Sequence, residues 1–349
     1  MDAKDQDMEP QAGDAMIYIP LVVDSARDGF RLDRFLVSRI TRLSRTRVQE
    51  IVAAGRVRRA DTGEVILRPA QRLRVGEALV IERPAPLEPS VVLDYTELHR
   101  DPDLLVLDKP AGLPVHPSAR YHNHTLTAVM RTRMGRGHGW DMAHRLDRET
   151  SGVLIFGRHG GSASVLKRAF SERTVEKTYW ALCAGHIAEP VRIDMPLGPA
   201  KDSEIHIKIG PRALDDGGVH AATGVTPMAH GEFRGLPITL IELHPETGRQ
   251  HQIRVHMAEI GHPLLGDKLY GLAEARFLAV VDGERSGSST PPARALAELE
   301  AELGLARHAL HAASICFDHP ATRERVRFAA PWPADLAAIM PMVPMVPMV

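Results

Sequence analysis

The pattern of apolar and polar positions over residues 16–84 predicts a small sheet and two short helices. Apolar side chains recur every three or four positions in 31–40, which predicts one helix. Ser44 is placed to cap a second helix, and Gly55 ends it. Pro20 restricts the first strand to a sheet edge. Strands are predicted at 17–23, 56–58, 65–67 and 79–81.

Strand and helix patterns alternate without a regular βαβ rhythm in the longer part of the chain, residues 95–333, which indicates an α+β fold with a mixed or antiparallel sheet. Residues 199–222 are irregular, and 272–300 have the pattern of an insertion. Strands are predicted at 104–108, 153–156, 175–187, 236–243, 315–317 and 325–328. Helices are predicted after Thr125, at 162–170 and at 248–260, the last with Thr247 as its N-cap.

Composition divides the chain into five segments. The first 15 residues are acidic and are expected to be disordered, as is the tail 334–349 with its Met-Pro-Val repeat. A proline-rich linker at 85–94 is expected to separate a small α/β domain, 16–84, from a large domain, 95–333.

Charge is unevenly distributed along the 349 residues, although the formal net charge is only −1. Residues 30–84 contain 13 arginines against six acids, a net charge of +7. Such a basic module favours an anionic partner, most simply nucleic acid, and the alternative is a solvated arginine-rich face. Two cysteines with no metal spacing and the lack of a long apolar segment predict a cytoplasmic protein with no membrane partner.

Three side chains in the large domain are candidates for chemistry. Asp147 stands between two arginines on a loop that leads into a buried strand, where reactive groups are often held, although such a group is more often a surface ion pair. Arg254 lies at the edge of the buried side of its helix and needs an anionic partner, unless only its stem is packed. Tyr179 lies beside small residues and suits either a wall for a flat ring or the core.

Metal and nucleotide cofactors fit the sequence poorly. Among 18 histidines, His251 and His256 are five residues apart on one predicted helix, about 140° from each other around its axis. A zinc pair on one helix prefers four residues. Because a glycine-rich phosphate loop is also lacking, no cofactor and no metal are expected.

Four ordered motifs resemble the RluA-type pseudouridine synthases over residues 95–330. They are Lys109-Pro-Ala-Gly-Leu-Pro-Val-His-Pro-Ser118, His144-Arg-Leu-Asp-Arg-Glu-Thr-Ser-Gly152, Lys177-Thr-Tyr179, and Thr247-Gly-Arg-Gln-His-Gln-Ile-Arg-Val-His256 followed by Gly266-Asp-Lys-Leu-Tyr-Gly271. The small domain is similar to the alpha-L RNA-binding module through Arg31-Leu-Asp-Arg-Phe-Leu36, Ser44-Arg-Thr-Arg-Val-Gln-Glu-Ile51 and Gly55-Arg-Val57. It departs from that module at Arg59-Ala-Asp61, where a Val-Asn-Gly-type turn is common.

The resemblance implies an enzyme that isomerises uridine to pseudouridine in RNA as a monomer without a cofactor. Asp147 would be the catalytic aspartate, Tyr179 would pack on the target base and help to move its proton, and Arg254 would pair with the aspartate. Arg145 would enter the RNA helix when the base leaves it. The RNA-binding arginines of the small domain would be Arg31, Arg34, Arg45, Arg47 and Arg56.

The chemistry suits these residue types. The C1′–N1 bond breaks, the uracil rotates and a C1′–C5 bond forms, so the sum of atoms is unchanged. Attack of Asp147 at C1′, attack on the pyrimidine ring and abstraction of a 2′ proton all need an ionised carboxylate, which a paired arginine favours. The expected substrate is large-subunit ribosomal RNA. The alternatives are transfer RNA as the substrate, a non-catalytic RNA-binding or ribosome-assembly protein, and a metal-dependent hydrolase.

Overall fold

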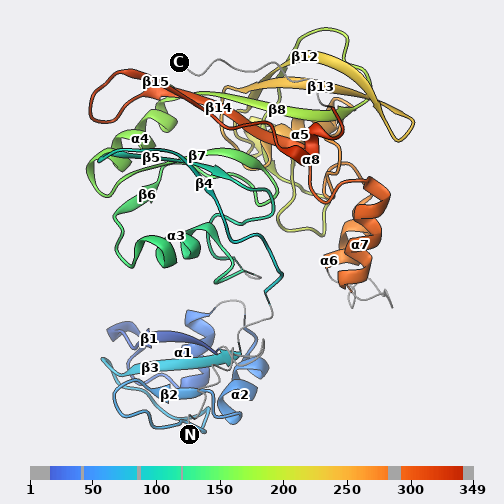
Figure 1. Ribbon diagram of the computed structural model, residues 1–349. Coiled ribbons are helices and arrows are strands. Elements are labelled where there is room, and N and C mark those ends of the chain that lie inside the picture. The colour runs from blue at the N-terminus through green and yellow to red at the C-terminus, as the bar shows by residue number, and fades with distance from the viewer. Residues whose placement is uncertain (1–15, 41–42, 85–87, 119–120, 282–291, 341–349) are drawn as a thin grey trace, which may run out of the picture. The chain divides into compact units, whose positions relative to one another are not determined.

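The computed structural model describes residues 16–40, 43–84, 88–118, 121–281 and 292–340. The chain divides into two compact units at the boundary between Pro89 and Ser90, and each contains its own hydrophobic core (Figure 1). The segment 1–15, which was expected to be disordered, and residues 341–349 of the tail expected at 334–349 lie outside the described residues. Among the described residues, no helix has both the length and the apolar surface needed to cross a bilayer.

The N-terminal unit contains the small sheet and the two helices that its sequence predicts. Its antiparallel sheet has the order β1-β3-β2, so the Pro20 strand lies at an edge. The Ser44 hydroxyl accepts a hydrogen bond from Arg47 N at 3.2 Å and caps the second helix. The elements are β1 (Met16–Val22), η1 (Ser25–Arg27), α1 (Leu32–Arg39), α2 (Arg45–Ala53), β2 (Val57–Arg59) and β3 (Ala78–Pro84).

One strand predicted in this unit, at 65–67, is wrong. Val65 forms only an isolated bridge with Arg58, and the buried Ile66 donates its N–H to Val57 O at 2.8 Å. These contacts join residues 65–67 to the edge strand β2 without a continuous ladder, so they extend the sheet by a bridge and not by a strand.

The larger unit is built on one mixed sheet, which confirms the α+β prediction. The strand order is β4-β5-β7-β14-β8-β13-β12-β9, with β6 paired to β7 and β15 to β14. Every pair is antiparallel except β7 with β14. The strands are β4 (Thr96–Arg100), β5 (Leu104–Lys109), β6 (Trp140–Met142), β7 (Ser151–Arg158), β8 (Glu176–Ala184), β9 (Val191–Asp194), β12 (Ala222–Phe233), β13 (Leu236–Pro245), β14 (Leu310–Asp318) and β15 (Arg325–Ala329).

Helices cover both faces of this sheet. Alternate residues of β5 and β7 pack toward α3 on one face and toward α4 on the other. On β8, Ala181 and Cys183 face α5, whereas Leu182 faces α8. The remaining elements are α3 (Leu126–Met134), α4 (Gly161–Glu172), β10 (Leu197–Pro199), β11 (Ile209–Pro211), η2 (Leu214–Asp216), α5 (Gln252–Glu259), α6 (Glu274–Val281), α7 (Pro292–Leu303) and α8 (Ala334–Ala337).

Three predictions in the larger unit need correction. Residues 222–233 form the strand β12, whose pattern is obscured by Pro227 at a bulge. The helix predicted from Gly248 begins at Gln252, because His251 has a left-handed backbone with φ 54°. The tail does not begin at 334, because α8 packs there with Leu336 fully buried. The predicted insertion forms α6 and α7.

Candidate active site

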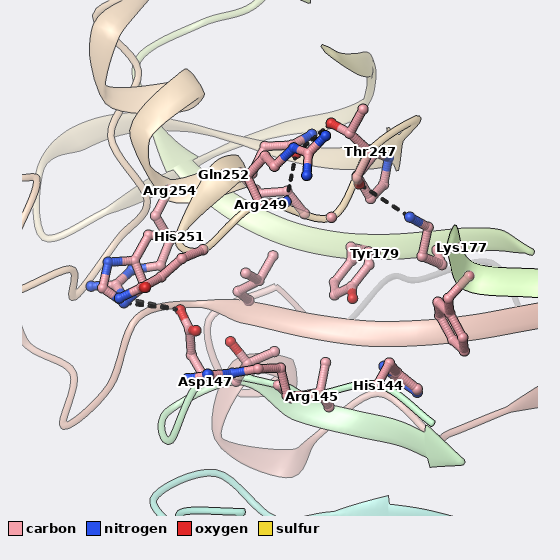
Figure 2. Close-up of a pocket in the computed structure, with 18 of the residues that line it drawn as sticks. His144, Arg145, Asp147, Lys177, Tyr179, Thr247, Arg249, His251, Gln252 and Arg254 are labelled. Atoms are coloured by element: carbon pink, nitrogen blue, oxygen red, sulfur yellow. Dashed lines mark hydrogen bonds and ion pairs between the residues drawn. The ribbon is translucent and has the colours of Figure 1, made fainter. Parts of the chain in front are cut away.

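A pocket of about 640 Å³ opens in the larger unit between the loop that precedes β7, strand β8 and the N-terminal end of α5 (Figure 2). Asp147 lies on the first of these elements, Tyr179 on the second and Arg254 on the third. The structure therefore brings together three candidate residues that are far apart in the sequence.

A buried lysine holds the backbone of the Asp147 loop through hydrogen bonds. Lys109, fully buried, donates from Nζ to Arg148 O at 3.1 Å and to two carbonyls of its own loop, Pro110 O and Leu113 O. Burial lowers the pKa of Lys109 to about 7. The loop also passes close to β14: a Cβ added at Gly152 would lie 2.2 Å from Ala312 O. A lysine and a glycine thus fix the backbone that follows the carboxylate, at Arg148 and at Gly152.

Arg254 links two carboxylates. Its Nη1 donates to Asp147 Oδ2 at 3.0 Å, while Nε and Nη2 form a bidentate pair with Asp267 at 2.7 and 2.9 Å. Asp267 is itself buried and accepts the backbone N–H groups of Leu269 and Tyr270. The guanidinium stands over the Tyr270 ring, 5.0 Å from its centroid. Residues 267–270 therefore orient the guanidinium and compensate part of its charge.

Two histidines complete the surroundings of the carboxylate. His251 Nδ1 lies 2.7 Å from the Tyr270 hydroxyl, and its Nε2 lies 3.9 Å from Asp147 Oδ2. His308 Nε2 lies 2.8 Å from the Thr150 hydroxyl. Burial lowers the pKa of each imidazole to about 4, so both are neutral at pH 7.

Asp147 is held in its ionised form. Burial acts to raise its pKa, but the neighbouring His251 and Arg254 outweigh burial and hold the pKa of Asp147 below its ordinary value. Because His251 is neutral at pH 7, Arg254 supplies the permanent charge in this balance. The site can therefore present a carboxylate ion inside a partly closed pocket at neutral pH.

Tyr179 forms one wall of the pocket. It packs between the core cluster around α3 and the cluster around α5. Burial, followed by the charge of Asp147, raises the pKa of Tyr179 above its ordinary value. No hydrogen bond from a described residue occupies its hydroxyl, so a neutral phenol faces the pocket. Figure 2 shows Tyr179 between Asp147 and Lys177.

The two arginines that flank Asp147 have different surroundings. Arg145 is exposed at the pocket, and no described carboxylate pairs with it. Arg148 donates to the Tyr121 hydroxyl at 2.7 Å and to Glu149 at 2.6 Å. Arg148 is therefore part of the structure, whereas Arg145 is available to a ligand.

The five arginines predicted to bind RNA lie in the N-terminal unit, and several have partners there. Arg31 and Arg45 both pair with Asp33, which is 1% exposed. Arg47 pairs with Glu50 at 2.7 Å. Arg34 stands 4.3 Å over the Phe30 ring, and Arg56 has no described ion pair.

No group of three or more potential metal ligands occurs among the described residues. The family model for RNA pseudouridylate synthase matches residues 103–259, which include Asp147, Tyr179 and Arg254. The ribosomal large subunit pseudouridine synthase D of Zymomonas mobilis is 31% identical over 90% of this chain and 94% of its own length. The protein of the same name from Xanthomonas campestris is 33% identical over 96% of this chain and 95% of its own.

The chain belongs to the RNA pseudouridylate synthase family. It is an isomerase that acts on RNA. A solved structure supports the fold: human RNA pseudouridylate synthase domain containing 1 has a TM-score of 0.52 and 28% identity over 70% of this chain and 86% of its own.

The pseudouridine synthase site contains residues to which the sequence analysis assigned no part in the reaction. Asp267, Tyr270, Lys109 and His251 all lie inside the recognised motifs, yet each meets the site only through tertiary contacts. A buried-helix arginine that needs an anion was the available signal for Asp267. That signal named no partner, and the family resemblance supplied Asp147 alone, because a single guanidinium rarely indicates how many carboxylates it binds.

Proposed function

We propose that this pseudouridine synthase isomerises uridines in large-subunit ribosomal RNA, with Asp147 as the catalytic carboxylate. The observation that carries the proposal is the Arg254 Nη1–Asp147 Oδ2 contact of 3.0 Å at the base of the pocket. The names of the relatives from Zymomonas and Xanthomonas support the ribosomal target.

Each residue of the pocket has its own role in the proposed reaction. The target uridine leaves its helix, because its C1′–N1 bond is inaccessible in a stack. Its uracil packs on Tyr179, and its ribose lies against Asp147. The sugar becomes electron-poor as C1′–N1 breaks, and an ionised carboxylate acts there as nucleophile or proton acceptor. After rotation, C1′–C5 forms, C5 loses its proton and the freed N1 takes one up, so that the sum of atoms is unchanged.

Arg254 keeps Asp147 ionised and oriented in this scheme. The Tyr179 hydroxyl, a neutral phenol with no described partner, is placed to carry the proton from C5. Arg145, exposed beside the pocket, fills the space that the base leaves in the RNA helix, which suits a flat and permanently charged side chain.

The N-terminal unit serves as the RNA-binding module, and the protein acts as a monomer. We place the protein in the cytoplasm. Two free cysteines, Cys183 and Cys316, support a reducing compartment.

Mapping pseudouridines in total RNA from cells with and without this protein tests the proposal. The expected result is the loss of defined pseudouridines from large-subunit ribosomal RNA, restored by the wild-type chain but not by Asp147→Asn. Loss confined to transfer RNA would overturn the target, and restoration by Asp147→Asn would overturn the role of the carboxylate.

A further inference from the structure

A second charged region of the pocket lies on the side away from Arg254. Lys177 precedes Tyr179 by two residues on β8, so both side chains leave the same face of the sheet, about 7 Å apart along the strand. Both line the pocket, and Figure 2 shows the Lys177 amine directed toward the loop at Thr247. Its Nζ donates to Thr247 O at 3.1 Å, which leaves two of its three donors for other partners.

No carboxylate among the described residues neutralises Lys177. Glu246 lines the same pocket but is held by Arg192 through two hydrogen bonds of 2.7 and 2.9 Å. Glu176, the preceding residue, pairs with Arg325 at 2.6 Å. Burial and the charge of Arg173 lower the pKa of Lys177 to about 8, so the amine remains mostly protonated at pH 7. A half-buried ammonium without a counter-ion is costly unless a ligand supplies the negative charge.

Arg173 adds a second cation under an unusual backbone constraint. It ends α4 in the left-handed region with φ 61°, and the following Thr174 N donates to Ala169 O at 3.1 Å. Glycine is strongly preferred at this position of a helix end, because it has no Cβ to strain. The Arg173 side chain nevertheless lines the pocket, is exposed, and has no hydrogen bond or ion pair with a described residue. A charged residue therefore stands where backbone stability favours glycine.

The third basic group in this region does not contribute charge. His144 stacks on Phe170 with ring centroids 4.6 Å apart. Burial lowers the pKa of His144 to about 3, so it is neutral. Lys177 and Arg173 thus carry free positive charge on this side of Tyr179. Two further exposed arginines without a described carboxylate partner, Arg249 and Arg145, also line the pocket.

We propose that Lys177 and Arg173 form a subsite for a backbone phosphodiester of the RNA that flanks the target uridine. The inference rests on the proposed function, because it assumes that the uracil occupies the Tyr179 wall. An RNA chain whose target base lies on Tyr179 and whose target ribose lies at Asp147 continues past the pocket, and an unneutralised lysine and arginine on the far side of Tyr179 provide a place for a phosphodiester of its neighbouring nucleotides. Phosphate contacts of this kind fix the register of a nucleic acid without reading its sequence.

The test pairs protein variants with a chemically altered substrate. The probe is a short RNA hairpin that the wild type isomerises, prepared with a neutral methylphosphonate at the linkage 5′ or 3′ of the target uridine. The variants are Lys177→Met, which keeps the length and removes the charge, and Arg173→Gly. Arg168→Gln is the matched control, because Arg168 is an exposed arginine of the same helix that does not line the pocket.

Each variant should lower RNA affinity about tenfold or more, the usual effect of losing a charged hydrogen bond. One of the two neutral linkages should weaken binding to the wild type to a similar extent and should weaken binding to Lys177→Met little further, because the same contact is already lost. Arg173→Gly should raise the melting temperature, since it relieves the left-handed backbone, while affinity falls. Arg168→Gln should change neither quantity.

Other outcomes identify which idea is wrong. The subsite would be wrong if the loss of RNA affinity in Lys177→Met added fully to the loss caused by each of the two neutral linkages. It would also be wrong if Arg168→Gln lost as much affinity. Neither result would contradict the proposed function. A wild type that binds but isomerises no uridine in RNA would overturn the proposed function and the subsite with it.

Discussion

The Arg254 guanidinium and the Asp267 carboxylate form a buried bidentate pair, with Nε–Oδ2 at 2.7 Å and Nη2–Oδ1 at 2.9 Å. This pair uses two of the nitrogens of Arg254 and leaves Nη1 for Asp147. Because the guanidinium is planar, Asp267 fixes the position of Nη1 and thereby orients the candidate catalytic carboxylate. Asp267 touches no reacting atom in this scheme and acts as a positioning residue.

Asp267→Asn should damage both stability and turnover. The substitution leaves the Arg254 charge buried with one carboxylate instead of two, and breaking such a pair typically costs about 3–5 kcal/mol. Turnover should fall because Arg254 is no longer held toward Asp147. Urea unfolding and single-turnover rates measure the two effects, and Asp202→Asn at an exposed position is the control. A rate equal to wild type in folded Asp267→Asn would contradict the positioning role.

Asp147→Asn should abolish isomerisation while the chain remains folded. The amide keeps the shape of the side chain, and Arg254 retains its bidentate partner Asp267. Release of tritium from RNA labelled at uridine C5 measures turnover, because C5 loses its proton in the reaction. RNA affinity, measured in parallel, should change little. Substantial tritium release by this variant would remove Asp147 from the chemistry.

Activity should persist as the pH falls toward the ordinary pKa of an aspartate. The folded protein holds the pKa of Asp147 below that of the unfolded chain. Its contribution to stability is therefore fully present above the unfolded value, about 3.9, and is lost only as the pH falls through the lower, folded value. The dependence of kcat/KM on pH should show no acid limb from this group between pH 5 and 7. Substitution of Arg254 by Met should move such a limb upward.

Tyr179→Phe separates stacking from proton transfer. Phenylalanine keeps the aromatic wall, so RNA affinity should stay near that of the wild type. If the phenol carries the C5 proton, turnover should fall by about 10²–10⁴-fold, the usual contribution of general acid–base catalysis. A slow step after formation of the C1′–C5 bond would then appear as a large isotope effect at C5. An unchanged rate would limit Tyr179 to stacking.

Periodicity and capping signals predicted most of the elements that surround the site. The pattern of the strand predicted at 175–187 placed Tyr179 beside small residues, and in the structure it shares a face of β8 with Ala181 and Cys183. Strand β12 was missed because Pro227 and two glycines interrupt its pattern, and pairing with β13 and β9 holds it extended. The start of α5 was misplaced because the Thr247 hydroxyl donates to the Gln252 side chain instead of capping residues 248–250.

The pairing of charges was predicted less well than the elements, because ion pairs join residues that are far apart in sequence. The arginine-rich pattern of the N-terminal unit showed a net charge, but it did not show that Asp33 lies buried between Arg31 and Arg45. In the same way, the motif around Gly266 contained Asp267 without indicating its partner. Which charges remain for a ligand is decided by tertiary structure.

This distinction gives a prediction for the N-terminal unit. Arg34 and Arg56 have no described carboxylate partner, whereas Arg31 and Arg45 hold the buried Asp33. The double variant Arg34→Gln, Arg56→Gln should therefore weaken RNA binding with only a small loss of stability, from the Arg34 contact with the Phe30 ring. If each arginine contacts one phosphate, the slope of log K against log salt should fall by about one for each.

Substitution of an arginine that pairs with Asp33 should instead lower stability. Arg31→Ala leaves a buried carboxylate with fewer partners, so the melting temperature of the unit should fall. Since burial acts to raise the pKa of Asp33 and the arginines Arg31 and Arg45 lower it, the loss should shift that pKa upward. Salt-dependent binding and thermal unfolding of both sets of variants, measured in the full chain, distinguish the two groups. If Arg34→Gln, Arg56→Gln keeps the wild-type salt slope, these two arginines do not contact the RNA, and the anionic partner of the basic unit must lie against other side chains.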